Sequence, residues 1–395
     1  MKRVFSYSIL SFFLLLLPTG QASANNNDSI RLSLLTCAPG EEIYSLFGHT
    51  AIRYENSSQG IDVVFNYGLF SFNTPNFIFR FSLGETDYQL GATDYERFAA
   101  EYAFFGRSVW QQTLNLTDEE KTELIRLLQE NYRPENRVYR YNFFYDNCAT
   151  RPRDKIEESI AGKVIYPAEP QDGSLTFRDI VHQYCKGHPW ARFGIDLCIG
   201  SEADQPITQR QMMFAPFYLM DAFDGAQIKG DSIQRPLITA NELIVDATPE
   251  PDESDWMPTP LQCSLLLFIL TAAATIYGIR RRTGLWGIDL FLFGIAGIVG
   301  CVLAFLALFS QHPAVSSNFL LLVFHPGQLL FLPYIIYCVR KGKKCWYLTL
   351  NLAVLTLFIV LFPVIPQRFD FAVVPLALVL LIRSASNLIV TSKKK

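Results

Sequence analysis

The sequence predicts a mixed α+β domain followed by an all-α membrane domain, and three observations support this. The N-terminal part of the chain mixes short β-branched and aromatic stretches with helices that open on capping boxes. After residue 260 the composition changes to long apolar runs, each long enough to cross a bilayer as a helix. Between the two parts lies a segment rich in Pro and acidic residues, residues 247–260, which we predict to be a linker.

Residues 1–24 have the features of an export signal. Lys2 and Arg3 form a charged start, an apolar core runs from Ile9 to Pro18, and Ala22-Ser23-Ala24 is a small-x-small cleavage site. The apolar core is too short for a membrane anchor, which is the alternative interpretation. We therefore predict a signal peptide at residues 1–24 and an exported, periplasmic domain at residues 25–246.

Charge and cysteine pattern argue against several classes of protein. The net charge of the 395 residues is −3, so no basic field favours nucleic acid, and we expect no such partner. None of the eight cysteines is in a C-x-x-C arrangement, and no Walker loop, dinucleotide fingerprint or Gly-x-Ser-x-Gly motif occurs. We expect neither a metal nor an organic cofactor. Cys185 and Cys198 are either free or paired as a disulfide, and the sequence leaves both open.

Within the exported domain, residues 30–36 alternate as a strand, and residues 49–54 and 61–67 form a hairpin across a polar turn. If the turn is centred near Ser57 and Ser58, antiparallel pairing places His49 opposite Asn66 on the same face. The other predicted elements are helices opened by capping boxes at Thr93 and Thr117, a strand at 108–114, helices at 149–161, 176–185 and 207–222, and short strands within 226–246.

The C-terminal part is predicted to be a helical membrane domain at residues 261–392. Positive charges gather in alternate loops, around Arg280-Arg281-Arg282, around Lys341 to Lys344 and at the terminal lysines, so the positive-inside rule places the C-terminus in the cytoplasm. The third apolar run contains His325-Pro326 and Pro333, which should kink it, and a four-span arrangement is the alternative to five. The five runs are residues 261–279, 286–309, 318–339, 345–363 and 371–392.

Cys148 is the candidate nucleophile. It directly precedes a predicted helix, and Arg151 and Arg153 follow closely, so a helix dipole and two cations would favour its thiolate. Its own backbone N–H, freed at the helix start, would help to form an oxyanion hole. The alternative is a buried structural cysteine, against which its polar neighbours argue.

His49 is the candidate base because its near-neutral pKa suits both removal and delivery of a proton. Gly48 before it allows close approach, and Asn66 is the candidate that fixes its tautomer. Tyr67 and Asp62 are alternatives to Asn66, and His182 and His188 are fallback bases. Asn147, Arg151 and Tyr145 beside the cysteine, and His312 and Asn318 in an outer loop of the membrane part, are candidate supporting or substrate-binding residues.

These residues give the chain a resemblance to the Lnb N-terminal periplasmic domain family. The motif around the cysteine is specific, and the resemblance spans most of the chain. The segments that carry it are Leu35 to Glu42, Phe47-Gly48-His49-Thr50-Ala51, Asn66-Tyr67-Gly68, Gly106-Arg107-Ser108-Val109, Tyr141 to Arg151, Phe193-Gly194-Ile195-Asp196 and His312 to Asn318.

The resemblance implies a circularly permuted papain-like (NlpC-like) thiol fold, similar in chain order to lecithin retinol acyltransferases. It implies a lipoprotein N-acyltransferase of the bacterial inner membrane, in which Cys148 is the nucleophile and His49 the base. An acyl chain would move from a membrane lipid ester, through a thioester, to the N-terminal amine of a lipid-modified cysteine. Bacterial lipoproteins and membrane lipids would be its partners, without a cofactor.

Two other classes of function stay open at this point. A periplasmic cysteine peptidase or amidase acting on cell-wall peptides would use the same cysteine and histidine, although it would need at most one membrane anchor. A non-catalytic membrane scaffold with a degenerate site is the other alternative.

Overall fold

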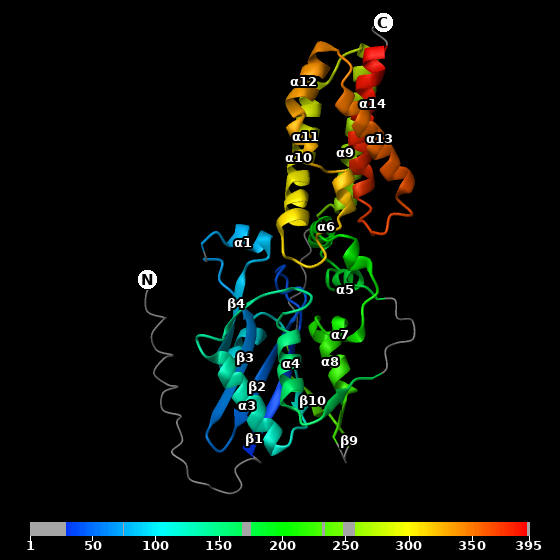
Figure 1. Cartoon of the computed structure of the whole chain (residues 1–395). Helices are drawn as coiled ribbons and strands as arrows, with labels where there is room; N and C mark the ends of the chain where they lie inside the picture. The colour runs from blue at the N-terminus through cyan, green and yellow to red at the C-terminus, as the bar shows by residue number, and fades with distance from the viewer. Residues whose placement is uncertain (1–28, 74, 168–174, 231–233, 248–256, 393–395) are drawn as a thin grey trace.

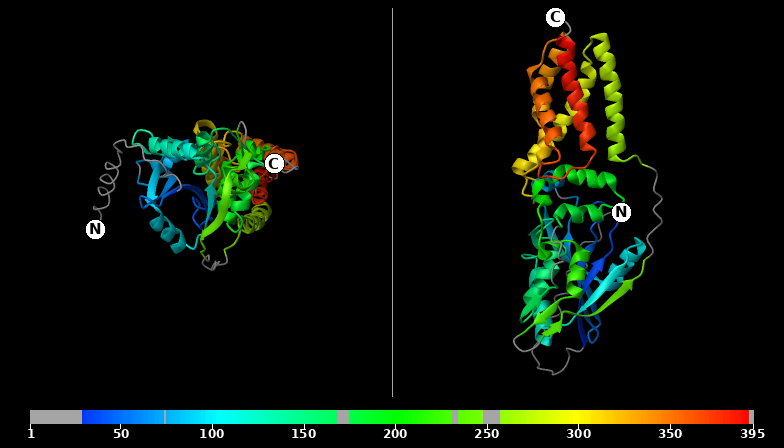
Figure 2. Two further views of the ribbon diagram at one scale, coloured as in Figure 1. Left: turned by 90° about the horizontal axis from the view of Figure 1, so that it is seen from below. Right: turned by 90° about the vertical axis from the view of Figure 1, so that its right-hand side faces the viewer.

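The computed structural model describes residues 29–73, 75–167, 175–230, 234–247 and 257–392. An α+β domain and a helical domain lie end to end, and the molecule is elongated along this direction (Figures 1 and 2). The predicted α+β domain and the helical domain after it are confirmed. The predicted signal peptide and most of the predicted linker lie outside the described residues.

The α+β domain is built on a seven-stranded antiparallel sheet in the order β10-β5-β1-β2-β3-β4-β6, with a three-stranded sheet β7-β8-β9 beside it. The large sheet comprises β1 (Ile30–Cys37), β2 (His49–Asn56), β3 (Ile61–Leu69), β4 (Asp87–Asp94), β5 (Val109–Leu114), β6 (Val138–Arg140) and β10 (Ile238–Val245); the small sheet comprises β7 (Lys163–Ile165), β8 (Gln227–Lys229) and β9 (Gln234–Pro236). The strands predicted near residues 30, 49, 61 and 108 are all present, whereas β4 was not predicted.

The β2–β3 hairpin forms, but its register differs from the prediction by two residues. Asn66 lies opposite Ala51 and not opposite His49, because the turn is centred between Ser58 and Gln59. A two-residue shift keeps every side chain on its predicted face, since side chains alternate with a period of two along a strand. Asn66 therefore still faces the same side as His49 and reaches it diagonally.

Eight helices and a 3-10 turn complete the described part of this domain: α1 (Phe77–Leu83), α2 (Tyr95–Phe104), α3 (Asp118–Tyr132), α4 (Thr150–Ser159), α5 (Phe177–Tyr184), α6 (Pro189–Cys198), η3 (Ser201–Asp204), α7 (Gln209–Met212) and α8 (Pro216–Asp224). The Thr117 capping box forms as predicted. The predicted Thr93 box does not, because Thr93 is paired within β4 and Asp94 is the N-cap of α2. Pro216 divides the predicted helix at 207–222 into α7 and α8; α1 and α6 were not predicted.

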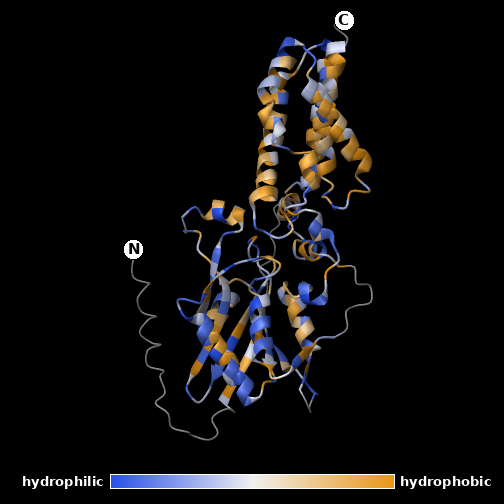
Figure 3. Ribbon diagram, viewed as in Figure 1, coloured by the Kyte–Doolittle hydropathy of each residue, from blue (hydrophilic) through white to orange (hydrophobic). Residues whose placement is uncertain are grey.

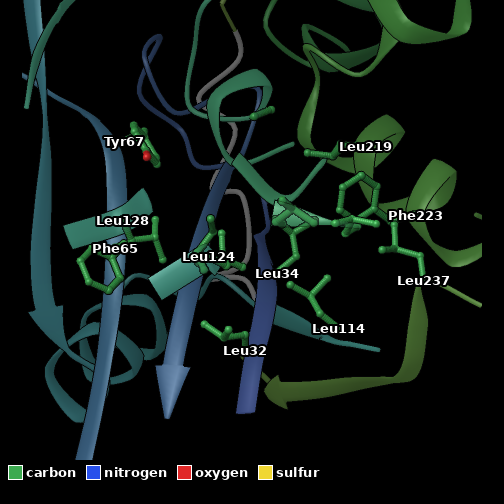
Figure 4. Packing of buried hydrophobic residues seen from close by; sticks show 14 of the residues in the cluster. Leu32, Leu34, Phe65, Tyr67, Leu114, Leu124, Leu128, Leu219, Phe223 and Leu237 are labelled. Atoms are coloured by element: carbon green, nitrogen blue, oxygen red, sulfur yellow. The ribbon is translucent and has the colours of Figure 1, made fainter. Parts of the chain in front are cut away.

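The two faces of the sheet carry separate cores. Leucines of β1 and aromatic residues of β3 pack against α3, α4 and α8 on one face, where Leu124 and Phe223 are fully buried (Figure 4). On the other face Phe98 of α2 covers Leu35, Cys37 and Ala51. Burial on both faces fixes the register of β1 and β2, which hold the candidate base.

The helical domain contains the five predicted apolar segments. Three of its described helices, α9, α10 and α14, are long and apolar enough to cross a membrane. The third segment is broken by 74° between Phe319–Leu330 and Leu332–Lys341, as its prolines predicted, and would count as a fourth span if the bent pair is one crossing. The elements are α9 (Pro260–Arg281), α10 (Trp286–Phe309), η4 (Phe319–Leu322), α11 (Gly327–Leu330), α12 (Leu332–Lys341), the shorter α13 (Trp346–Leu361) and α14 (Val373–Ser392), and apolar residues dominate them in Figure 3.

Two glycines of α10 allow the broken third segment to pack directly against this helix. A Cβ on Gly297 would lie 2.5 Å from the backbone nitrogen of Leu329, and one on Gly300 would lie 2.4 Å from that of His325. Small residues allow backbones to approach this closely inside a membrane domain.

The α+β domain contacts the two loops that carry few positive charges, residues 310–317 and 364–370, which the positive-inside rule places outside the membrane. The backbone N–H groups of Gly200 and Ser201 donate to Ala314 and Ser317 at 2.6 and 2.9 Å. Arg368 in the second loop pairs with Asp179 and Asp204 at 2.5 and 2.9 Å. The basic loops and the C-terminus lie at the opposite end of the helices (Figure 1). This arrangement supports the orientation that the positive-inside rule predicts.

Arg178 of α5 organises the docking unit formed by α5, α6 and η3. Its fully buried guanidinium pairs with Asp196 at 2.6 Å and with Asp204 at 2.8 Å, and it donates to the carbonyls of Ile199 and Gly200. One buried cation, Arg178, therefore holds together the docking unit that contacts the outer loops.

We predict that Arg178→Met destabilises the α+β domain by about 3–5 kcal/mol, because Asp196 would be left as a buried and poorly compensated charge. Thermal unfolding of the detergent-solubilised full chain measures this as a lower melting temperature. The matched control is Arg126→Met, which removes an exposed pair with Glu123 and should leave the melting temperature almost unchanged. Equal melting temperatures for the two variants would contradict the role of Arg178.

Candidate active site

The turn that carries Cys148 is held by the side chain of Asn147. The side-chain oxygen Oδ1 of Asn147 accepts hydrogen bonds from the backbone N–H groups of Ala149 and Thr150 at 2.8 and 3.0 Å, which caps the start of α4. Its NH₂ group donates to the carbonyls of Phe143 and Phe214 at 2.8 and 2.9 Å. The side chain is buried and uses both its donors, so it supports the turn and has no donor left for a substrate.

The sulfur of Cys148 lies against the first residues of β2. The backbone N–H of Thr50, the residue that follows His49, lies near the sulfur, and this N–H and that of Cys148 itself act to lower the pKa of the thiol. The β2–β3 ladder ends at the Ala51–Asn66 pair, so this part of β2 is open on the β3 side. Gly68, whose φ of +91° favours glycine, lies beside the cysteine, since a Cβ there would make ordinary contact with the Cβ of Cys148 at 3.5 Å.

His49 is the first residue of β2 and is positioned by the turn before it. Gly48 has φ +78°, and a Cβ on it would lie 2.5 Å from the carbonyl oxygen of Cys37, so only glycine fits here. The Nε2 atom of His49 lies 3.2 Å from Oδ1 of Asn66, whose amide nitrogen donates to the carbonyl of Val64. An amide oxygen only accepts, so Nε2 carries the proton and Nδ1 keeps its lone pair.

Burial keeps both reactive groups uncharged at neutral pH. Desolvation raises the pKa of the Cys148 thiol to about 11, although the two N–H groups at the sulfur act in the other direction. Desolvation also lowers the pKa of the His49 imidazole to about 4; the bond to Asn66 opposes this, and the nearby charge of Arg107 adds to it. Burial therefore opposes the thiolate that the helix start and the nearby cations were expected to favour.

The cations expected to stabilise the thiolate have other partners. Arg151 forms two hydrogen bonds with Asp146, at 2.6 and 2.7 Å, and stacks on the ring of Tyr139 at 3.6 Å. Arg153 pairs with Asp154 and donates to the carbonyl of Arg210. The sequence placed these charges near the cysteine but could not show that carboxylates neutralise them.

The other predicted residues lie in different surroundings. Tyr145 is exposed and packs its ring edge-on against Phe177. His312 lies 2.6 Å from the carbonyl oxygen of Phe81 in α1, and burial lowers its pKa. Asn318 is buried, caps η4 and donates to the carbonyl of Leu197. His312 and Asn318 thus join the two domains.

None of the alternatives to the His49–Asn66 pair approaches it in the described contacts. Tyr67 donates to Asn131, and Asp62 binds Arg53. His182 contacts Asp196 at 2.9 Å and borders an open cavity of about 410 Å³ between α5 and α6, and His188 lies 3.8 Å from Glu41. Cys185, which also borders that cavity, and Cys198 are both free, so the possible disulfide between them does not form.

Sequence reasoning missed two residues at the site. The buried Tyr139 hydroxyl has no hydrogen-bond partner among the described residues and lies 3.9 Å from where a Cβ on Gly68 would be, on the side of Cys148. Arg107 donates to the carbonyl of Ala38 and stacks over Tyr102 close to His49. No local sequence pattern around Tyr139 or Arg107 indicates that the fold brings them to the site. No His, Cys, Asp and Glu cluster suited to a metal occurs in the described ranges.

The structure is that of a membrane protein, an α+β domain joined to apolar helices long enough to cross a bilayer, and comparison with protein families identifies both parts. Residues 20–182 match the Lnb N-terminal periplasmic domain, and residues 252–395 match the Lnb transmembrane domain. The chain belongs to the Lnb family. No curated protein and no solved structure matched the chain.

The neutral resting state predicts a steep pH dependence of thiol alkylation. Iodoacetamide reacts with thiolate only, so the rate at Cys148 should rise about tenfold per pH unit from pH 7 towards its pKa of about 11. Peptide-level mass spectrometry of the intact protein measures the rate at each cysteine. Urea-unfolded protein is the control, with a plateau just above the free-thiol pKa of about 8.5. A rate at Cys148 that stays constant between pH 6 and 9 would contradict a neutral thiol.

Proposed function

We propose that this protein is a membrane-bound lipoprotein N-acyltransferase in which Cys148 is the nucleophile, His49 the acid–base group and Asn66 the residue that orients His49. The observation that carries the proposal is that the Cys148 sulfur lies near the backbone N–H of Thr50, the strand residue beside an imidazole that Asn66 orients. A Cys-His-Asn set is a known variant of the serine-type catalytic triad. Membership of the Lnb family supports the same activity.

In the first half-reaction the thiol attacks the carbonyl carbon of a lipid ester. The S–C bond forms while Nδ1 of His49 takes the thiol proton, and the C–O bond breaks while the same proton passes to the departing alkoxide. The products are a thioester on Cys148 and an alcohol. The pKa difference of about seven units would make a separate thiolate–imidazolium pair costly, on the order of 10 kcal/mol before the two charges attract each other. Proton transfer is therefore concerted with S–C bond formation.

In the second half-reaction the amine of the lipoprotein's N-terminal cysteine attacks the thioester. The C–N bond forms, the C–S bond breaks, and His49 accepts the amine proton and returns it to the sulfur. Water must be excluded at the thioester stage, because hydrolysis would turn the enzyme into a lipase. Burial of both groups, which also shifts their pKa values, limits the access of water.

The location of the site suits substrates that stay in a bilayer. His49 begins β2 at the end of the sheet nearest the helical domain (Figure 1). Gly84, which ends α1, packs against Gln311 and His312 of the outer loop. Donor and acceptor confined to one leaflet meet with a lower entropic cost than free molecules. The proposal includes an inner-membrane location with a cytoplasmic C-terminus, and a permuted papain-like fold in which the histidine precedes the cysteine.

Tyr139 is proposed as a donor to the oxyanion. Its buried hydroxyl has no partner in the described structure and borders Cys148, and Arg151 stacked on its ring fixes its position. A donor waiting where negative charge develops stabilises the transition state without reorganisation.

Loss of the thiol should abolish N-acylation. In a strain lacking the chromosomal gene, Cys148→Ala should leave the N-terminal amine of lipoproteins free, and His49→Ala should slow purified enzyme about 10²–10⁴-fold. Asn66→Ala should give a smaller loss, because it disturbs only the orientation of the ring. Mass spectrometry of a lipoprotein's N-terminal peptide, and turnover of a synthetic diacylated lipopeptide by the solubilised full chain, measure these effects. The matched control Asn115→Ala, which removes a side-chain hydrogen bond to the carbonyl of Pro236, should behave as wild type.

Unchanged lipoprotein N-termini in the Cys148→Ala strain would contradict the transferase proposal. Altered cell-wall peptides with unchanged lipoproteins would instead support a peptidase or amidase. Lipoproteins and wall peptides that both stay unchanged would support a scaffold.

Removal of the Tyr139 hydroxyl should lower kcat by up to about 10²–10³-fold, the loss seen when one oxyanion donor is deleted. Tyr139→Phe keeps the ring that Arg151 covers, so the KM for the lipopeptide should change little. Steady-state kinetics of the solubilised enzyme test this, with Tyr54→Phe as the control because its hydroxyl accepts a hydrogen bond from Asn56, at the end of β2 away from His49. A Tyr139→Phe enzyme with wild-type kcat would exclude the hydroxyl from the oxyanion site.

A further inference from the structure

The α+β domain exposes a group of large apolar side chains on α1 and the two loops beside it. Ile78 is 81% exposed, and Phe72, Tyr44 and Ile43 are each more than 60% exposed. We call this group the apolar rim; its members are Ile43, Tyr44, Phe72, Ile78, Phe79 and Phe81. So many neighbouring exposed apolar residues mark an interaction surface rather than ordinary solvent-facing surface.

The apolar rim lies at the level of the membrane helices. Phe79 packs against Phe305 of α10 with ring centroids 5.8 Å apart, and Phe305 lies about one helical turn, roughly 5 Å, inside the end of α10. Leu83 at the end of α1 accepts the backbone N–H of Gln311 at 2.8 Å. Figure 1 shows α1 beside the lower end of α10, and Figure 3 shows its apolar colour continuing that of the helical domain.

The one charge of α1 is neutralised on the protein side of the helix. Arg80 is the one charged residue of α1, and it pairs with Asp87 of β4 at 2.8 Å and donates to the carbonyl of Glu85. An apolar helix that lies beside the end of a spanning helix, with its single cation neutralised on the protein side, matches a segment lying in the bilayer interface.

A continuous series of aromatic rings leads from the apolar rim to the nucleophile. The ring of Phe72 contacts that of Phe70 with centroids 4.9 Å apart, Phe70 contacts Tyr88 at 5.0 Å, and Tyr88 stacks on Tyr141 at 4.2 Å. Tyr88 lies opposite Tyr139 in the β4–β6 pair, and the Tyr139 hydroxyl and the Cys148 Cβ both lie within 4 Å of where a Cβ on Gly68 would be. No charged side chain belongs to this series.

We infer that the apolar rim is immersed in the outer leaflet of the bilayer, and that the Phe72–Phe70–Tyr88–Tyr141 series is the surface along which a lipid acyl chain reaches Cys148. The occupant is a long-chain acyl group of a membrane lipid. The direct junction with α10 argues for lipid and against a soluble protein partner, because a partner protein would have to displace lipid headgroups to reach Ile78. This inference deepens the proposed function and rests on it for the role of Cys148, whereas immersion of the apolar rim does not depend on catalysis.

Photolabelling from within the bilayer tests the inference. The Cys148→Ala full chain, placed in nanodiscs whose phospholipid carries a diazirine at the end of one acyl chain, is irradiated and mapped by peptide mass spectrometry. Leu266 and Ile269, exposed on α9, are the positive standard, and Ile165, exposed on β7 at the far end of the α+β domain, is the negative standard. Because the protein cannot turn over, the labelling is independent of the proposed reaction.

We expect labelling of the apolar rim at a level near that of α9 and about tenfold or more above that of Ile165, together with labelling of Phe70 or Tyr88. In Ile78→Asp the labelling of α1 should fall while that of α9 is unchanged. Labels confined to the membrane helices, with the apolar rim no higher than Ile165, would overturn the immersion. Labelling of the rim without Phe70, Tyr88 or Tyr141 would overturn the acyl route. Failure of the transferase proposal would show in lipoprotein N-termini and would leave these labels as they are.

Discussion

The site depends on one constraint, the capped turn at Asn147. Four hydrogen bonds from a single buried amide fix the backbone on both sides of the cysteine, two to the start of α4 and two to the carbonyls of Phe143 and Phe214. With this turn fixed, the sulfur meets the Thr50 N–H at the start of β2. Elements more than ninety residues apart in the chain thereby share one small volume, and every proposed step requires that they stay there.

The same burial that holds the site also defines its chemistry. A thiol with a pKa of about 11 and an imidazole with a pKa of about 4 form an uncharged pair that is unreactive until an ester carbonyl arrives. Such a site suits an enzyme whose thioester must survive until a lipid-bound amine reaches it, since a site open to water would hydrolyse it. The docking of the α+β domain through Arg178 and the outer loops keeps this site at the membrane, and the apolar rim extends the same contact towards the lipid.

Much of the fold follows from local sequence patterns, and what was missed depends on distant contacts. Alternation predicts β1 to β3, the Thr117 capping box predicts α3, and apolar length predicts the membrane segments. The prolines of the third apolar run predict that it is bent. The register of the hairpin was displaced because a polar turn of five residues does not fix its own centre. The predicted face of Asn66 is nevertheless correct, because a register shift of two residues leaves each side chain on the same side of the sheet. Arg151 and Arg153 could not be separated from Cys148 by sequence alone, because their carboxylate partners are identified only by the folded structure. The proposed role of Tyr139 could not be predicted from the sequence, because only the packed structure shows that its hydroxyl is buried without a hydrogen-bond partner.

The most direct test of the account is the distance between the two reactive side chains in solution. A short bifunctional alkylating agent, 1,3-dibromoacetone, first alkylates the thiol and then reaches only a nucleophile within a few ångströms. The account predicts a peptide pair in which Cys148 is bridged to His49, found by mass spectrometry of the full chain in nanodiscs and absent from His49→Ala. A cysteine that carries only a single-ended adduct, or one bridged to His182, would contradict the placement of His49 as the partner of Cys148.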